Sequence, residues 1–130
     1  MGGIFTRYVY SNTIKTKYDV EIAYLEGFPA VFIASSTNNE SIKIASIRVG
    51  LKNHKLSAEH VPFGTFNLKR AYDKMDKIYT VSCQTTNEFI EKYPSCKEKT
   101  STIYTYFNVD YIKKKSKEKH ISIFDKNKFN

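Results

Sequence analysis

Short apolar runs and longer stretches with helical spacing take turns along the 130-residue chain. The apolar runs are rich in isoleucine, valine and tyrosine, and each ends at polar residues or glycine, as β-strands do. They predict four strands, at Val20–Leu25, Ile42–Val49, Lys77–Val81 and Thr100–Tyr104.

Helices are predicted between these runs. Pro29 suits a first helical turn, Ser82 suits an N-cap, and Pro94 ends the helix that Ser82 begins. The buried positions of these helices are expected at Ala30, Val31, Ile33 and Ala34, then at Leu68, Ala71, Tyr72 and Met75, then at Phe89, Ile90 and Tyr93. A last helix runs to Lys119 with Asn108 or Asp110 as its cap, and residues 4–15 are either helical or irregular.

Strands separated by helices of about ten residues favour crossover connections and parallel pairing. The sequence therefore predicts an α/β fold, a Rossmann-like parallel sheet of about four strands with flanking helices, as in a three-layer domain. Residues 51–64 contain Pro62 and Gly64 without any period, so they are expected to form a long connection.

Composition agrees with one soluble domain, because 41% of the residues are hydrophobic and 26% are charged. The apolar run at residues 28–34 is far shorter than the roughly 20 residues that span a bilayer, and the N-terminus lacks the pattern of a secretory signal. The two cysteines, Cys83 and Cys96, form no metal-binding or disulfide pattern. We expect a cytoplasmic protein.

The net charge of +8 is uneven, since residues 111–130 carry seven basic and two acidic groups. A nearly neutral domain with a basic tail argues against a nucleic-acid-binding fold. The lysines of the tail are expected to make a weak contact with an anionic membrane surface, or simply to be solvated.

Few residues suggest chemistry. No glycine-rich phosphate loop and no nucleophile elbow occur, the histidines do not converge as metal ligands, and no histidine is placed beside Cys83. Arg48 is the exception, because it follows an apolar strand at the end where open parallel sheets bind ligands. An arginine there can hold a phosphate or a sugar carboxylate through two hydrogen bonds, or it can be a surface residue at a strand end.

Three segments resemble the later half of the acceptor-side domain of family-4 glycosyltransferases, which are retaining enzymes of the GT-B type. They read YDVEIAYLEGFPAVFIA, KIASIRVGLKNHKLS and KRAYDKMDKIYTVSCQTTNEFIEKYPSCKEKTSTIYTYFNVDYIKKKSKEK. The resemblance covers residues 18–119 and is most specific from Asp76 to Ile112. It implies a partial acceptor-side domain at residues 1–120 and the start of a linker to a donor domain at residues 121–130.

This sequence departs from the family at several site positions. Ser46, Arg48 and Gly50 stand where tryptophan, histidine and aspartate are usual, and Cys83 replaces a glutamate. Further departures occur in the crossing to the donor domain, at Thr105, Tyr106 and Asn108. The resemblance identifies no catalytic residue here, and it places Arg48, Lys52, His54 and Ser82 at the acceptor cleft.

The resemblance implies retaining transfer of a sugar from a nucleotide-sugar to a saccharide or lipid-linked acceptor, in surface polysaccharide synthesis at the inner membrane face. Such folds do not usually require a metal ion, and no cofactor is implied. Because the donor-binding domain and the glycine-rich loop are not in this sequence, the chain alone is expected to transfer no sugar. The alternatives are a non-catalytic binding or interaction module, or a decayed copy that needs a separate donor-domain chain. Nucleic acid is not expected as a partner.

Overall fold

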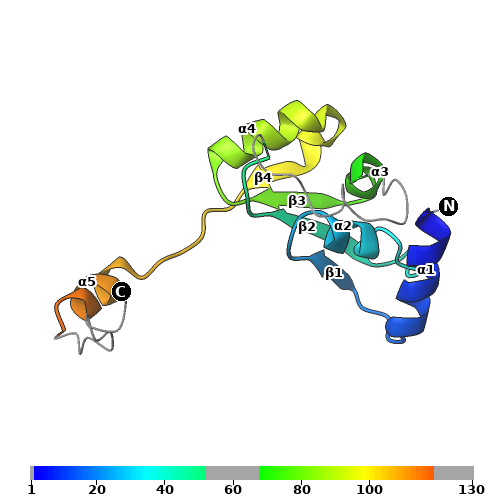
Figure 1. Ribbon diagram of the computed structural model, residues 1–130, viewed down its shortest axis with the longest axis horizontal. Helices are drawn as coiled ribbons and strands as arrows, with labels where there is room; N and C mark the ends of the chain where they lie inside the picture. Colours follow the sequence, from blue (N-terminus) through cyan, green and yellow to red (C-terminus); the bar gives the residue numbers. More distant parts are fainter. Residues whose placement is uncertain (1, 52–67, 119–130) are drawn as a thin grey trace, which may run out of the picture.

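A four-stranded parallel sheet organises the chain in the computed structural model, which describes residues 2–51 and 68–118 (Figure 1). The strands are β1 (Val20–Ala23), β2 (Ile42–Ile47), β3 (Lys77–Thr80) and β4 (Thr100–Thr102), and they lie side by side in chain order. All three pairings are parallel, as predicted. The predicted α/β fold with a Rossmann-like parallel sheet is therefore confirmed.

The helices are α1 (Gly2–Thr13), α2 (Phe28–Ile33), α3 (Leu68–Asp73), α4 (Cys83–Lys92) and α5 (Val109–Ser116), with a 3-10 helix η2 at Pro94–Lys99. Two caps match the prediction. Ser82 Oγ accepts a hydrogen bond from Thr85 N at the start of α4, and Asn108 Oδ1 accepts one from Tyr111 N at the start of α5. Helix α3 is shorter than predicted, so Met75 reaches the core from the turn that follows it.

The hydrophobic core lies on one face of the sheet. Ala23, Ala45, Ile47 and Ile78 point to this side and pack with buried residues of α2, α3 and α4, namely Ala30, Val31, Leu68, Ala71, Tyr72 and Phe89. The small alanines on the strands let these helices approach the sheet closely. Tyr10 fixes α1 to the same layer, because its hydroxyl donates to Glu21 Oε1 on β1 over 2.8 Å and its ring lies 5.1 Å from that of Phe32.

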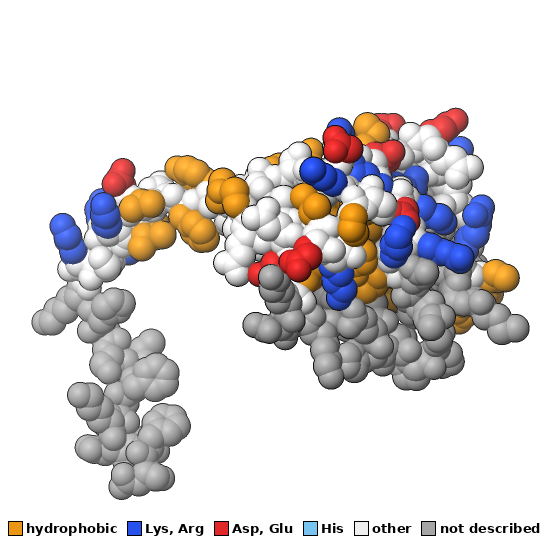
Figure 2. Space-filling view, turned by 90° about the horizontal axis from the view of Figure 1, so that it is seen from above, with side chains coloured by type: hydrophobic (Ala, Val, Ile, Leu, Met, Phe, Trp, Pro, Cys, Tyr) orange, Lys and Arg blue, Asp and Glu red, His pale blue; other side chains and the backbone are white. Residues whose placement is uncertain are grey.

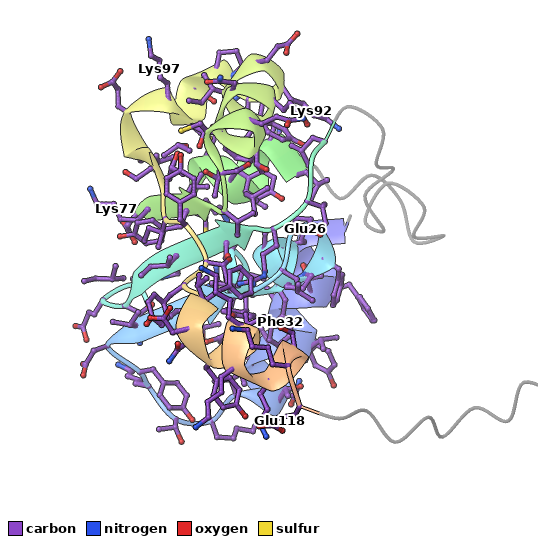
Figure 3. All side chains as sticks on the ribbon, turned by 90° about the vertical axis from the view of Figure 1, so that its left-hand side faces the viewer. Glu26, Phe32, Lys77, Lys92, Lys97 and Glu118 are labelled. Atoms are coloured by element: carbon purple, nitrogen blue, oxygen red, sulfur yellow. The ribbon has the colours of Figure 1, made fainter. Side chains whose placement is uncertain are left out.

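The opposite face of the sheet is bare among the described residues. Its apolar residues are Val20, Ile22, Ile42, Ile44 and Tyr79, beside the polar residues Ser46, Lys77 and Ser101, and we call it the bare face. Figure 3 shows Lys77, which pairs with Ile44, pointing to this open side while α1 and α2 lie on the other. The described part thus has two layers, and the three-layer arrangement expected from the sequence is not formed by it.

Topology explains the bare face. Strands that are added in chain order by right-handed crossovers place every crossover helix on the same side of the sheet. Covering the second side requires crossovers that run in the other direction, and these meet the first set at a switch point. The order β1-β2-β3-β4 contains no switch point.

Asp73, at the end of α3, gives a pH dependence that can be measured. Hydrogen bonds from Lys69 and Ser95, each 2.7 Å long, lower the pKa of its carboxyl group. A carboxyl whose pKa is lower in the folded state stabilises the fold above its unfolded pKa of about 4 and loses this contribution as pH falls through its folded pKa. We expect Asp73→Asn to unfold at a lower urea concentration than the wild type at pH 7. The two proteins should converge as the pH falls through the folded pKa of Asp73.

The expected difference is below about 1 kcal/mol, because the carboxylate is exposed to solvent. Asp110→Asn, in the first turn of α5, is a control that should not change the unfolding of the sheet domain. A difference between Asp73→Asn and wild type that stays the same from pH 7 to pH 3 would contradict this assignment.

Candidate functional site

A groove of about 360 Å³ runs along the bare face toward the carboxyl ends of the strands. Because all four strands are parallel, the residues that follow each strand meet at this one edge. The lining residues are Ile22, Tyr24, Ile44, Ser46, Arg48, Tyr79, Thr80, Val81, Ile103, Tyr104 and Thr105. Among the described residues the lining is therefore mostly apolar and aromatic, with hydroxyl groups and one cation.

Arg48 supplies that cation, and its position is the one predicted. It directly follows β2, is half-buried, and its guanidinium carbon lies 4.8 Å from the centre of the Tyr24 ring. Stacking on an aromatic face leaves the N–H groups at the edge of a guanidinium available. No described residue accepts a hydrogen bond from this side chain, so its donors can serve a bound group.

Two glutamates hold the backbone around Arg48. Glu26, labelled in Figure 3, accepts a hydrogen bond from Arg48 N over 3.2 Å, and Glu88 on α4 accepts one from Leu51 N over 2.7 Å. Gly50 lies so close to Glu88 that a Cβ atom added there would be 2.9 Å from its Oε2. The backbone after β2 is thus held between the segment that carries Glu26 and helix α4, and this positions Arg48 at the groove.

Tyr104, which follows β4, also lines the groove. Its hydroxyl lies 2.9 Å from Cys83 Sγ, at the first residue of α4. This hydrogen bond raises the pKa of Tyr104, so the tyrosine is a neutral hydroxyl at pH 7.

The four residues placed at an acceptor cleft by the resemblance have different outcomes. Arg48 lines the groove. Ser82 lies at the same edge of the sheet but does not line the groove, and its hydroxyl accepts the N-cap hydrogen bond from Thr85 N. Lys52 and His54 lie outside the described residues, so their roles remain predictions.

Sequence reasoning did not identify Tyr24, Glu26, Glu88 or Tyr104 as parts of this site. Tyr24 and Tyr104 lie just beyond the last hydrogen-bonded residues of β1 and β4, within the predicted strand ranges. The available signal was their place at strand ends, because parallel strands bring these ends together.

Within residues 2–51 and 68–118, no three histidine, cysteine, aspartate or glutamate side chains lie close enough together to hold a metal ion. None of the helices described is both long and apolar enough to cross a membrane.

We compared the chain with protein-family models, with curated proteins and with solved structures, and none of the three comparisons found a match.

Proposed function

We propose that this chain is the acceptor-side part of a retaining glycosyltransferase similar to family 4, and that the groove beside Arg48 holds the acceptor saccharide. The groove is the observation that carries this proposal. It combines tyrosine rings, hydroxyl groups and the Arg48 guanidinium, which stacks on Tyr24 and donates no hydrogen bond to a described residue, at the carboxyl edge of a parallel sheet. Ligand pockets in proteins commonly combine an apolar lining with a few polar groups that fix orientation.

The chemistry of the groove favours an acidic sugar. Tyr24, Tyr79 and Tyr104 offer ring faces and hydroxyls to a saccharide, while Arg48 can hold a carboxylate or phosphate substituent through two parallel hydrogen bonds. The bond to a charged group contributes more than a bond between neutral groups. Arg48 therefore distinguishes an acidic saccharide from a neutral one.

Sugar transfer requires more than this groove. The charge that develops on the nucleotide as the donor bond breaks must be stabilised, and in the family that the sequence resembles a second domain does this. Arg48 is always protonated, so it cannot accept a hydrogen bond or exchange a proton as the usual histidine can. In this proposal Arg48 binds and orients the acceptor, and a donor-binding domain completes the enzyme.

We expect the chain to bind a glucuronic-acid disaccharide with a Kd on the order of 1 mM, and the matched neutral glucose disaccharide at least tenfold more weakly. Two-dimensional NMR should show chemical shift changes at Ser46, Tyr79 and Tyr104. Arg48→Ala should remove the preference for the acidic sugar, because the neutral groups of the groove remain. Arg48→Lys should retain part of it as a single point charge.

Lys97→Ala is the matched control, since it removes an exposed cation of η2, labelled in Figure 3, and η2 precedes β4 whereas the groove residues follow it. It should leave both affinities unchanged. Equal binding of the acidic and neutral disaccharides by the wild type, or shift changes confined to residues outside the groove, would overturn the proposal.

The bare face supports a second candidate function, an interaction module completed by another chain. Parallel sheets are nearly always covered on both faces, and no described helix covers this one.

A further inference from the structure

The residues after β4 form an arm that is as apolar as the bare face. We define the arm as residues 105–116, which comprise an extended segment and α5. Figure 1 shows α5 set apart from the sheet at the end of this segment, and none of its residues is buried. Five large apolar side chains of the arm are each more than half exposed, namely Tyr106, Phe107, Val109, Tyr111 and Ile112.

Figure 2 shows these hydrophobic side chains gathered along the arm, with lysines beside them. The apolar positions Val109 and Ile112 are three apart in α5, so they share one side of the helix, whereas Tyr111 projects from a different side. An amphipathic helix is stable when its apolar side is buried against another surface. The arm therefore has a side that needs a partner.

The bare face also exposes apolar side chains that a partner would have to cover. Ile22 is 54% exposed and Ile42 is 50% exposed, although strands with apolar residues on both faces normally lie between two layers. Isolated apolar residues on a surface need no explanation, but a continuous patch over neighbouring strands marks an interaction site. Val20 pairs with Ile42 and Ile22 pairs with Ile44, so this patch is continuous.

We propose that the arm of a second copy of this chain covers the bare face, and that two copies exchange their arms in a symmetric dimer. Each copy carries one arm and one bare face, so reciprocal exchange satisfies both and closes the assembly. The five apolar side chains of one arm bring on the order of 500 Å² of apolar surface. Two such contacts, counted on both partners, reach the roughly 1,200–2,000 Å² of a specific interface.

The path of the chain disfavours docking of an arm on its own sheet. Ile103, Tyr104 and Thr105 already line the groove at β4, and only four residues, 105–108, separate Tyr104 from α5. Four extended residues span at most about 14 Å. The most apolar strands, β1 and β2, lie two to three strand spacings away, about 10–14 Å, and in the opposite half of the sheet.

To reach β1 and β2, residues 105–108 would have to be fully extended and would also have to reverse the direction of the chain. These four residues include no glycine or proline, the residues that favour such a turn. A second copy accepts the arm in the extended form that the structure shows. The bare face and the groove share Ile22, Ile44 and Tyr79, so a docked arm competes with a saccharide.

Sedimentation velocity and light scattering over about 1–300 μM test the exchange without any saccharide, so the result is independent of the proposed groove ligand. The wild type should pass from monomer to dimer within this range. Ile112→Lys removes the apolar anchor of the arm, and Ile22→Lys places a charge on the bare face. Each should raise the dissociation constant of the dimer at least tenfold. Lys114→Ala, on the polar side of α5, should not.

A mixture of the two variants distinguishes arm exchange from other dimers. Ile112→Lys keeps an intact bare face and Ile22→Lys keeps an intact arm, so one arm–face contact can form between them. We expect the mixture to form heterodimers at concentrations at which each variant alone is monomeric. Circular dichroism should show both variants folded, because the substituted side chains are at least half exposed.

A wild type that stays monomeric to 300 μM overturns the proposal, including the case in which the arm docks on its own sheet. A dimer that Ile112→Lys leaves intact, which would indicate direct pairing of two bare faces, also overturns it. So does a mixture that stays monomeric.

Discussion

Tyr72→Ala should destabilise the folded chain by about 3–5 kcal/mol, as large truncations of buried aromatic residues do. Tyr72 on α3 is 0% exposed. Its ring lies 5.1 Å from that of Phe89 in an edge-to-face arrangement and 5.0 Å from that of Tyr93. Replacement by alanine would leave a cavity where α3 and α4 meet above the sheet.

The hydroxyl of Tyr72 contributes separately. It accepts a hydrogen bond from Gly27 N over 3.3 Å, and burial raises its pKa, so it stays neutral across the usual pH range. Gly27 has a φ of 81°, which favours glycine, and it begins α2. Tyr72→Phe keeps the ring and removes the acceptor, so about 1 kcal/mol should be lost.

Urea unfolding followed by circular dichroism measures both changes. A loss of about 3–5 kcal/mol is a large part of the stability of a typical domain, so we expect a measurable unfolded fraction of Tyr72→Ala even without urea. The graded series from wild type through Tyr72→Phe to Tyr72→Ala keeps the result interpretable. Tyr8→Ala, at a 67% exposed position on α1, should change little. A cost below 1 kcal/mol for Tyr72→Ala would contradict the packing described for this layer.

The strands could be predicted because their apolar runs are short and clearly bounded, but their ends could not. Each predicted strand is longer than the observed one at its carboxyl end. Leucine, valine and tyrosine continue there past the last ladder hydrogen bond, and Val81 and Tyr104 line the groove instead. Local β-propensity does not distinguish a paired residue from an apolar residue at a binding edge.

Arg48 could be placed from the sequence because its location follows from the strand before it. Its contact with Tyr24 and the support from Glu26 and Glu88 depend on which strands are neighbours, and strand order is not encoded in local spacing. The bare face was not predicted for a related reason. Val20, Ile22, Ala23, Ile42 and Ile44 make β1 and β2 apolar on both faces, as in a sheet with two covering layers.

Ile22 and Ala23 are adjacent on β1, so lysine at each tests the two faces of the sheet in the same strand. Ala23 is 1% exposed and points into the core beneath α2, whereas Ile22 points to the bare face. Ala23→Lys would bury an unpaired ammonium group and overfill a closely packed position, and we expect it to prevent stable folding.

Ile22→Lys should change the stability of the monomer by less than about 1 kcal/mol, because the side chain remains in water. Urea unfolding must be done near 1 μM, where arm exchange between copies does not contribute. Ala23→Val, a smaller enlargement on the covered side, should fall between the two lysine variants. If Ile22→Lys proves as destabilising as Ala23→Lys at this concentration, then part of the same chain covers the second face. The other outcome is that Ile22→Lys is tolerated at 1 μM but does not show the gain in stability that the wild type shows at higher concentration. In that case isoleucine is favoured at position 22 by burial against another molecule and not by burial within the monomer. Contact with another molecule then explains the apolar pattern of β1.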